Sequence, residues 1–302
     1  MTGTPVRLAA YAGALALAFG AAYAVGASAD PVTSTPRPTH RNTTSGPEAD
    51  MDGHAESTAA VPTPAGLAVT DSGYTLVPAA DAVPAGRQVP FRFTVTGPDG
   101  RPVTAYERSH EKDLHLIVVR RDLAGFQHVH PTQAGDGSWV VPLDLAASGS
   151  YRVFADFVPA ALGRKLVLGA DLSVAGDFRP VALPGPAAKA TVDGYDVSLA
   201  GSATAGEESE LTFTVAKDGA KVTDLQPYLG AFGHLVSLRA GDLAYLHTHP
   251  AQEAVTGAKG GPQVRFTTTF PTAGTYRLFL DFRHDGVVRT VAFTVTVDAD
   301  GH

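Results

Sequence analysis

The sequence predicts an all-β protein made of two tandem immunoglobulin-like β-sandwiches, and three observations lead to this prediction. The 302 residues include 32 glycines and 22 prolines, and helix-period patterns are scarce after residue 30, which favours short strands joined by turns. Apolar and polar residues alternate with a period of two in segments such as residues 91–95, as in a strand with one buried face. Residues 66–176 recur as residues 190–298, and each copy has about seven strand signals, the number expected of a sandwich.

The two copies share five landmarks in the same order. These are a Gly-Tyr pair, a period-2 strand, an Asp-Gly turn of the kind that joins hairpin strands, a strand ending in Asp-Phe and a closing alternating strand. They begin at residues 73, 91, 99, 149 and 166 in the first copy and at residues 194, 211, 218, 274 and 287 in the second. Two repeats are too few for a solenoid, so each copy should have its own core. The prolines of residues 177–189 predict a short, stiff linker between the copies.

The N-terminal 65 residues have a different composition. Residues 6–26 are almost entirely apolar, about as long as the roughly 20 residues that span a bilayer as a helix. Ala27, Ser28 and Ala29 follow in the small-x-small form of a signal-peptidase site. Residues 1–29 are therefore either a signal peptide, which we favour, or a transmembrane anchor, and both place the remainder outside the cytoplasm, secreted or anchored. Residues 30–65 are rich in Thr, Pro and Ser and are predicted to be a disordered linker.

Composition excludes several classes of partner and site. The net charge is −7 with no run of Lys or Arg, so nucleic acid is not an expected partner, and membrane contact is expected only through the N-terminal segment. The absence of cysteine excludes disulfides, thiolate metal sites and cysteine nucleophiles. The only methionines are Met1 and Met51, so a metal site in the repeats must use imidazole and carboxylate, which favours Cu(II) or Zn(II) over Cu(I).

One stretch in each repeat concentrates the histidines. Residues 114–131 read LHLIVVRRDLAGFQHVHP and residues 234–250 read HLVSLRAGDLAYLHTHP. Six of the 11 histidines fall here at matching positions: His115, His128 and His130, then His234, His247 and His249. If each stretch is a β-hairpin that turns at residues 121–124 or 240–242, His115 lies opposite His130 and Ile117 opposite His128. Alternation then places the three imidazoles of each copy on one face, with directly opposed Cβ atoms about 5 Å apart. The same face carries apolar residues, so we expect the histidines at the rim of the sandwich core.

Three imidazoles on one partly shielded face favour a metal site. Neutral imidazoles there need partners, and they cannot all be charged together, whereas a metal ion takes up their lone pairs. Candidate additional ligands are His110, Asp156, Asp281 and His284. Each aspartate lies on the same face of its strand as Arg152 or Arg277, and a cross-strand or same-strand ion pair is the favoured alternative for both. For the histidines, the alternative is that each is a hydrogen-bonded structural residue.

The quoted hairpins and the YRxFxDF strand resemble segments of uncharacterised secreted bacterial proteins, over residues 66–298. More loosely, the plan is similar to that of CopC-like and YtkA-like envelope β-sandwich domains. The CopC-like resemblance implies copper held by His and Asp ligands. The chain departs from that pattern because a mature N-terminus at Asp30-Pro31 would lack a histidine, and because the repeats lack methionine-rich loops.

Together these observations predict a non-catalytic, extracytoplasmic copper protein that acts in buffering, delivery or resistance. Its expected partners are the metal ion, zinc being the alternative to copper, and a membrane transporter or another envelope copper protein. A metalloenzyme is disfavoured because no recurrent Glu or Asp lies beside the hairpins to act as a general base, and no HExxH or nucleophile-elbow motif occurs. The alternative from a different class is a metal-free adhesion or scaffold protein.

Overall fold

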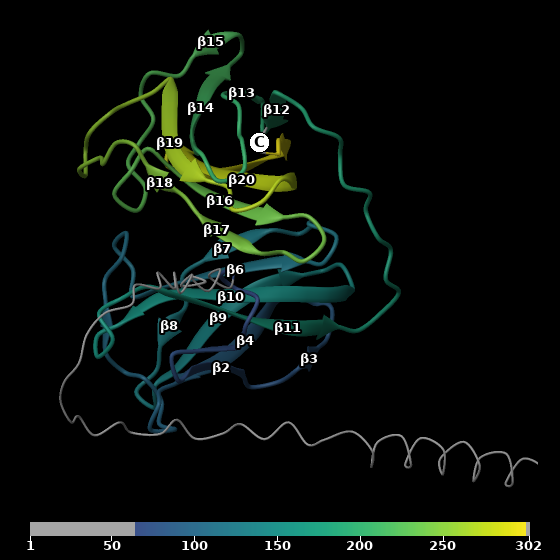
Figure 1. The fold of residues 1–302 in the computed structure, drawn as a ribbon, viewed down its shortest axis with the longest axis vertical. Helices are drawn as coiled ribbons and strands as arrows, with labels where there is room; N and C mark the ends of the chain where they lie inside the picture. Colours follow the sequence, from purple (N-terminus) through teal and green to yellow (C-terminus); the bar gives the residue numbers. More distant parts are fainter. Residues whose placement is uncertain (1–63, 300–302) are drawn as a thin grey trace, which may run out of the picture. The chain divides into compact units, whose positions relative to one another are not determined.

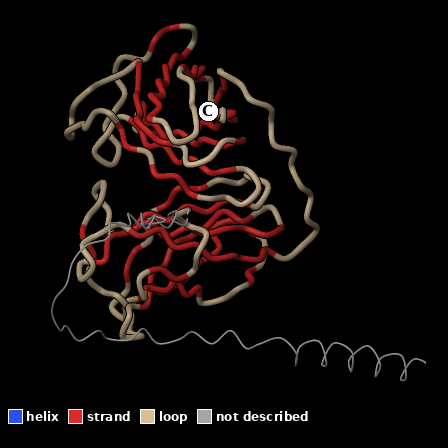
Figure 2. Tube along the Cα trace, in the orientation of Figure 1, coloured by secondary structure: helices blue, strands red, loops and turns tan. Residues whose placement is uncertain are grey.

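The computed structural model describes residues 64–299, and residues 1–63 and 300–302 lie outside the described part. The expected signal or anchor segment and most of the expected linker (residues 30–65) therefore fall outside it. Residues 64–299 contain strands, turns and loops (Figure 2), and among them there is no helix of the length and apolarity needed to cross a membrane. The all-β prediction is confirmed.

The first sandwich consists of two sheets (Figure 1). One sheet has the order β1-β2-β4-β9-β8, and the other has the order β3-β11-β10-β6-β7, with β5 also pairing with β10. The strands are β1 (Thr70–Asp71), β2 (Tyr74–Pro78), β3 (Ala82–Val83), β4 (Gly86–Thr96), β5 (Tyr106–Glu107), β6 (Leu114–Arg120), β7 (Gln127–Val129), β8 (Thr132–Gln133), β9 (Ser138–Leu145), β10 (Gly149–Pro159) and β11 (Leu166–Val174).

The second sandwich repeats this arrangement. Its sheets have the orders β12-β13-β14-β19-β18, with β15 also pairing with β14, and β17-β16-β20-β21. The strands are β12 (Lys189–Val192), β13 (Tyr195–Ala200), β14 (Glu208–Lys217), β15 (Ala220–Lys221), β16 (Gly233–Arg239), β17 (Tyr245–His247), β18 (His249–Pro250), β19 (Gln263–Thr269), β20 (Gly274–His284) and β21 (Val287–Val297).

Strand order and one side-chain contact make both sandwiches immunoglobulin-like. In each, the first long strands and a later one share a sheet (β2-β4-β9 and β13-β14-β19), while the closing strands pair with the histidine hairpin in the other. Immunoglobulin domains also have a tyrosine at the start of their sixth strand whose hydroxyl bonds to the backbone just upstream. Here the Tyr151 hydroxyl donates to the carbonyl of Ala147 at 2.7 Å, and the Tyr276 hydroxyl donates to the carbonyl of Thr272 at 3.0 Å.

Each sandwich has its own apolar core, as the sequence predicts. The first core contains Phe93 and Trp139, which are 0% and 2% exposed. The second contains Phe213, Phe266 and Phe293. Each core consists of residues from one repeat only, so neither sandwich needs residues of the other to complete its interior.

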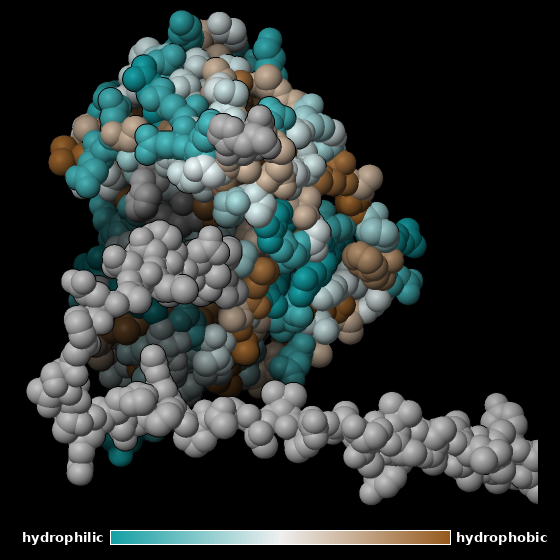
Figure 3. Space-filling view, viewed as in Figure 1, coloured by the Kyte–Doolittle hydropathy of each residue, from teal (hydrophilic) through white to brown (hydrophobic). Residues whose placement is uncertain are grey.

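A third apolar cluster joins the two sandwiches. Its members are Ile117, Val119, Leu123, Phe154, Val236, Leu238, Leu243, Tyr245 and Phe279, the first four from the first sandwich and the rest from the second. Beside it, the rings of Phe126 and Phe279 stack with centroids 3.9 Å apart and planes 6° apart. On the face seen in Figure 3, hydrophilic and apolar residues are intermixed.

This third cluster corrects one expectation about the histidine hairpin. Every residue of β6 is buried, because Leu116 and Val118 face the core of their own sandwich while Ile117 and Val119 face the second sandwich. His115 lies on the same side as Ile117, since alternate residues share a face. The prediction that the histidine face borders the core of its own sandwich was therefore wrong, and this face packs against the other repeat.

Candidate metal centre

The first histidine hairpin has the register that the sequence predicts. β6 and β7 are antiparallel, with Ile117 opposite His128 and Leu116 opposite Val129. The turn between them is fixed by Asp122, whose carboxylate accepts hydrogen bonds from the Arg120 guanidinium at 2.7 and 2.8 Å. Continuing this register by one residue at each end places His115 opposite His130.

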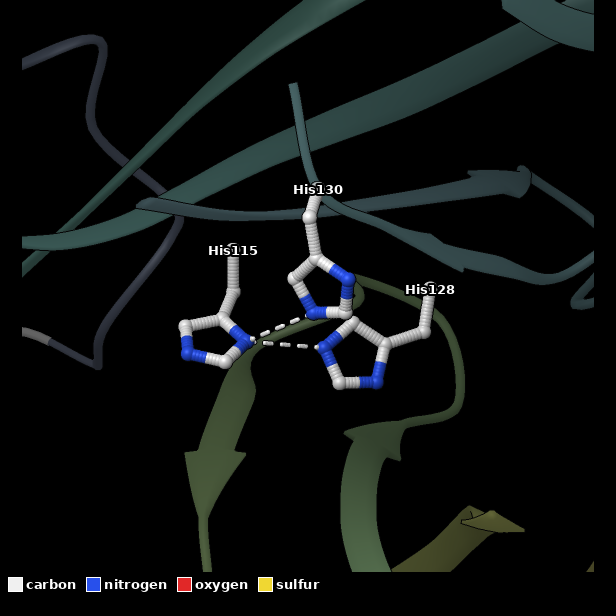
Figure 4. Close-up of side chains that lie close together, drawn as sticks. All are labelled: His115, His128 and His130. Atoms are coloured by element: carbon white, nitrogen blue, oxygen red, sulfur yellow. Dashed lines mark hydrogen bonds between the residues drawn. The ribbon is translucent and has the colours of Figure 1, made fainter. Parts of the chain in front are cut away.

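The three imidazoles of this hairpin converge on one point (Figure 4). His115 Nδ1 lies 3.1 Å from His128 Nε2 and 3.2 Å from His130 Nε2. One nitrogen from each ring lies within 4.8 Å of the other two, and among the described residues this is the group of His, Asp or Glu side chains with the geometry to hold a metal ion. His115 is buried, and the other two are partly buried.

In two of these rings, the nitrogen that points away from the cluster is hydrogen-bonded to another part of the protein. The carbonyl oxygen of Ser109 lies 2.9 Å from His115 Nε2, and a carbonyl only accepts, so Nε2 carries the proton. Asp281 Oδ2 lies 2.8 Å from His128 Nδ1, so Nδ1 donates to this carboxylate. A neutral imidazole has one N–H, so when both rings are neutral, His115 Nδ1 and His128 Nε2 present lone pairs to each other across 3.1 Å.

Two lone pairs at this distance repel unless a cation lies between them. Burial, followed by the proximity of His128, lowers the pKa of His115 to about 4. Burial, followed by the proximity of His128 and His115, lowers the pKa of His130 to about 2. A proton on His115 Nδ1 or His130 Nε2 is therefore unfavourable at neutral pH, and a neutral His130 that donates to His115 leaves a neutral His128 Nε2 without a donor.

A divalent metal ion fits the two separations that involve His115 Nδ1. Nitrogens bound at about 2.0–2.1 Å to one ion lie roughly 2.9–3.4 Å apart for bond angles between 90° and the tetrahedral value. The distances of 3.1 and 3.2 Å fall in this range. The outer hydrogen bonds of His115 and His128, to a carbonyl and a carboxylate, are also those that orient metal-binding histidines.

The two aspartates suggested by the sequence lie beside the cluster, one in each repeat. Asp156 on β10 is paired with His115 in the sheet, and Asp281 on β20 is paired with His234. Asp281 Oδ1 accepts a hydrogen bond of 2.5 Å from the hydroxyl of Thr290. Asp156 lies 3.3 Å from the ammonium group of Lys165.

The ion pair expected of each aspartate does not involve the arginine of its own strand, and for Asp156 the partner is Lys165, which directly precedes the neighbouring strand β11. Arg152 instead forms an ion pair with Asp171 at 3.0 Å, and Arg277 donates to the hydroxyl of Thr294. Asp156 also accepts a hydrogen bond of 3.1 Å from the hydroxyl of Tyr245, which belongs to the second repeat.

In the second repeat, the structure describes one of the three hairpin histidines in side-chain detail. His234 Nε2 donates to the carbonyl of Tyr228 at 2.9 Å, matching the bond from His115 to Ser109, and burial lowers its pKa to about 3. Val236 is opposite His247 in the backbone register, as Ile117 is opposite His128. The side chains of His247 and His249 lie outside the described part of the structure.

The two further candidate histidines lie in different places. The His110 ring centroid is 5.2 Å from that of His234 and 6.2 Å from that of His115. His284 lies apart from the cluster, with its nitrogens 2.7 Å from the hydroxyl of Tyr195 and 2.9 Å from Asp224 Oδ1. Of these two, His110 is the one placed to reach the cluster.

A small, partly open cavity adjoins the cluster between the repeats. It has a volume of about 20 Å³ and is lined by residues of both repeats: His110, His115, His128, Asp156, Lys165, His234, Leu235, Val236, Tyr245 and Thr248. This is room for about one water molecule.

The sequence did not predict Ser109 and Tyr228 as partners of the cluster. Each precedes a hairpin histidine by six residues, and this shared spacing in the two copies is the signal that could have identified them.

A family model matches both sandwiches. The model is described as a domain of unknown function, DUF8832, and it matches residues 68–170 and 190–299. The chain belongs to the DUF8832 family. The two DUF8832 matches contain the two histidine hairpins, so each hairpin is part of a family repeat. No curated protein matches the sequence.

Solved structures similar to this DUF8832 protein include bacterial surface proteins. A DUF4426 family protein from Pseudomonas aeruginosa is 10% identical, with 37% of this chain and 97% of that one covered and a TM-score of 0.28. The Escherichia coli adhesin FdeC is 19% identical, with 78% and 66% covered and a TM-score of 0.26. Invasin, a bacterial integrin-binding protein, is 11% identical, with 77% and 41% covered and a TM-score of 0.24. At these values the likenesses carry no argument about function.

Proposed function

We propose that this protein binds a divalent transition-metal ion, Cu(II) in preference to Zn(II), through His115 Nδ1, His128 Nε2 and His130 Nε2. The observation that supports this most strongly is the pair of outer hydrogen bonds that, in neutral rings, direct the lone pairs of His115 Nδ1 and His128 Nε2 toward each other at 3.1 Å. Imidazole ligands bind Cu(II) more tightly than Zn(II) in the usual divalent series. The absence of cysteine from the chain removes the thiolate ligands that favour other metals.

We further propose that the protein is not an enzyme and acts outside the cytoplasm in copper buffering, delivery or resistance. Three protein ligands leave one position on the ion open. A water molecule, a further protein group or a donor from a partner protein, such as a membrane transporter or another envelope copper protein, can occupy it. The proposed location follows from the apolar residues 6–26 and the small-x-small sequence after them.

A second site in the other repeat is proposed on two observations. His234 Nε2 donates a hydrogen bond to a backbone carbonyl, as His115 Nε2 does. His247 is opposite Val236 in the strand register, just as His128 is opposite Ile117. The second site would use His234, His247 and His249. Among the further candidates, His110 and Asp156 line the cavity beside the first site, and Asp281 acts there through His128.

Calorimetric titration with Cu(II) and Zn(II) tests the proposal. Residues 30–302 should bind Cu(II) more tightly than Zn(II), and replacing His128 and His130 with glutamine should remove one ion from the stoichiometry. Replacing His40 and His54, which precede the repeats, is the matched control and should leave the titration unchanged. Circular dichroism checks that each variant is folded. Unchanged stoichiometry and affinity in the His128 and His130 variant would refute the site.

A thermal scan separates this function from that of a metal-free adhesion or scaffold protein. A ligand that binds only the native state raises its stability by about 2.7 kcal/mol when it is present at 100 times its Kd. We expect the thermal midpoint to rise with Cu(II) and to fall back with EDTA. A midpoint that responds to neither would favour the scaffold alternative.

A further inference from the structure

The first repeat's histidine cluster is supported by a residue from the second repeat. Asp281 belongs to β20 of the second sandwich, and its side chain is 4% exposed. Its Oδ2 accepts the hydrogen bond from His128 Nδ1 at 2.8 Å, while its Oδ1 is held by Thr290. The orientation of His128, and with it the position of Nε2, thus depends on how the second sandwich is docked.

The charge of Asp281 strengthens this dependence. Among the side chains that the structure describes, no Lys or Arg forms an ion pair with Asp281, whereas Asp156 at the equivalent position of the first repeat has Lys165. A buried carboxylate is unfavourable unless hydrogen bonds and positive charge balance it. An ion bound to His128 Nε2 would place positive charge on the opposite side of the same ring.

The two sandwiches have the means to separate without unfolding. Each has a complete core of its own, and the residues between β11 and β12 are mostly exposed. The contacts that join the sandwiches include the apolar cluster, the bond from His128 to Asp281 and the reciprocal bond from Tyr245 to Asp156. The joint is therefore a surface that an ion at the cluster can strengthen or weaken.

We propose that the metal ion acts as a clasp between the two repeats, with Asp281 as the positioning residue that makes the first repeat's site depend on the second. This inference rests on the proposed function and adds a regulation to it. Thermodynamic linkage requires that, if docking of the second repeat tightens metal binding, metal binding tightens docking by the same factor. Removal of such an outer hydrogen-bond partner typically weakens metal binding 10- to 100-fold.

The first experiment compares Asp281→Asn with Asp224→Asn. Asp224 is a matched control because it accepts a hydrogen bond from His284 in the same repeat at 2.9 Å, but it is not part of the cluster. In a Cu(II) competition assay with a chromophoric chelator, we expect the Kd of Asp281→Asn to rise 10- to 100-fold and that of Asp224→Asn to stay within about twofold of the wild type. Asp281→Glu should restore part of the affinity.

The electron paramagnetic resonance spectrum of bound Cu(II) reports on the ligands of the ion, and a loss of protein stability alone would not change it. It should change in Asp281→Asn, because His128 is reoriented, and stay unchanged in Asp224→Asn. Equal affinity and equal spectra for the two variants would overturn the clasp while leaving the metal site in place. Absence of Cu(II) binding by the wild type would instead overturn the proposed function.

The second experiment measures docking directly. The chain has no cysteine, so Asp99→Cys and Asp218→Cys introduce a unique pair of exposed labelling positions, one in each repeat. With a fluorescent donor and acceptor on these positions, Zn(II) should narrow the distribution of transfer efficiencies, and Asp281→Asn should reduce this effect. A distribution that is the same with Zn(II) and with EDTA, while Zn(II) binding is measured, would overturn the clasp.

Discussion

Replacing Phe279 with alanine should weaken the joint between the repeats while leaving both cores intact. The Phe279 side chain is 3% exposed, and its ring stacks on Phe126 with a centroid distance of 3.9 Å. Truncation of a buried phenylalanine costs about 3–5 kcal/mol. We expect the lower end, about 3 kcal/mol, because the gap opens toward a surface between sandwiches where the structure can relax.

Urea unfolding with two probes measures this loss and locates it. Trp139 is the only tryptophan and lies in the first core, so its fluorescence reports on the first sandwich, while far-UV circular dichroism reports on both. In the wild type the two curves should coincide, and in Phe279→Ala they should separate as the repeats unfold independently. Phe178→Ala is the control, because Phe178 is 50% exposed and its loss should change stability by less than about 0.5 kcal/mol. Equal midpoints for the two variants would refute the reasoning.

Three further predictions concern pH, a hydroxyl and a glycine. His115 and His234 have pKa values of about 4 and about 3 when folded, against about 6.5 when unfolded. The unfolded chain therefore binds more protons than the folded chain below pH 6.5. The metal-free protein should lose stability on the order of 2 kcal/mol per group between pH 7.5 and 5, as measured by urea unfolding in EDTA. A free energy of unfolding that does not change with pH over this range would contradict this prediction. Tyr151→Phe should cost about 1 kcal/mol by removing the bond to the carbonyl of residue 147, and an unchanged urea midpoint would contradict it. Gly169→Ala should be destabilising by at least about 1–3 kcal/mol, because its Cβ would lie 2.0 Å from a backbone oxygen; Gly185→Ala, with open space around it, should be neutral in the same assay.

The sequence was sufficient to predict the two sandwiches and the hairpin register. Period-2 alternation and the duplicated order of landmarks depend on local chemistry, which one chain displays directly. The same local rules placed His115, His128 and His130 on one face, because a hairpin with a defined turn leaves one register that buries the apolar residues.

Local sequence patterns could not predict what that face packs against. Strand β6 is apolar on both sides, and a strand buried on both faces reads as a continuous apolar run, so its pattern does not say which side faces its own core. The roles of Asp281 and Tyr245 depend on contacts between residues more than 80 positions apart in the chain. Such contacts arise from the docking of two folded units, which no spacing within either unit encodes.

The contact between the repeats joins equivalent faces of two similar units, as in an isologous homodimer. Residues 175–188 make this association intramolecular, and short linkers produce effective concentrations in the millimolar range. The equilibrium between closed and open arrangements therefore does not change when the protein is diluted. A substitution that loosens the contact shifts the ratio of these arrangements within each molecule and never sets one half free.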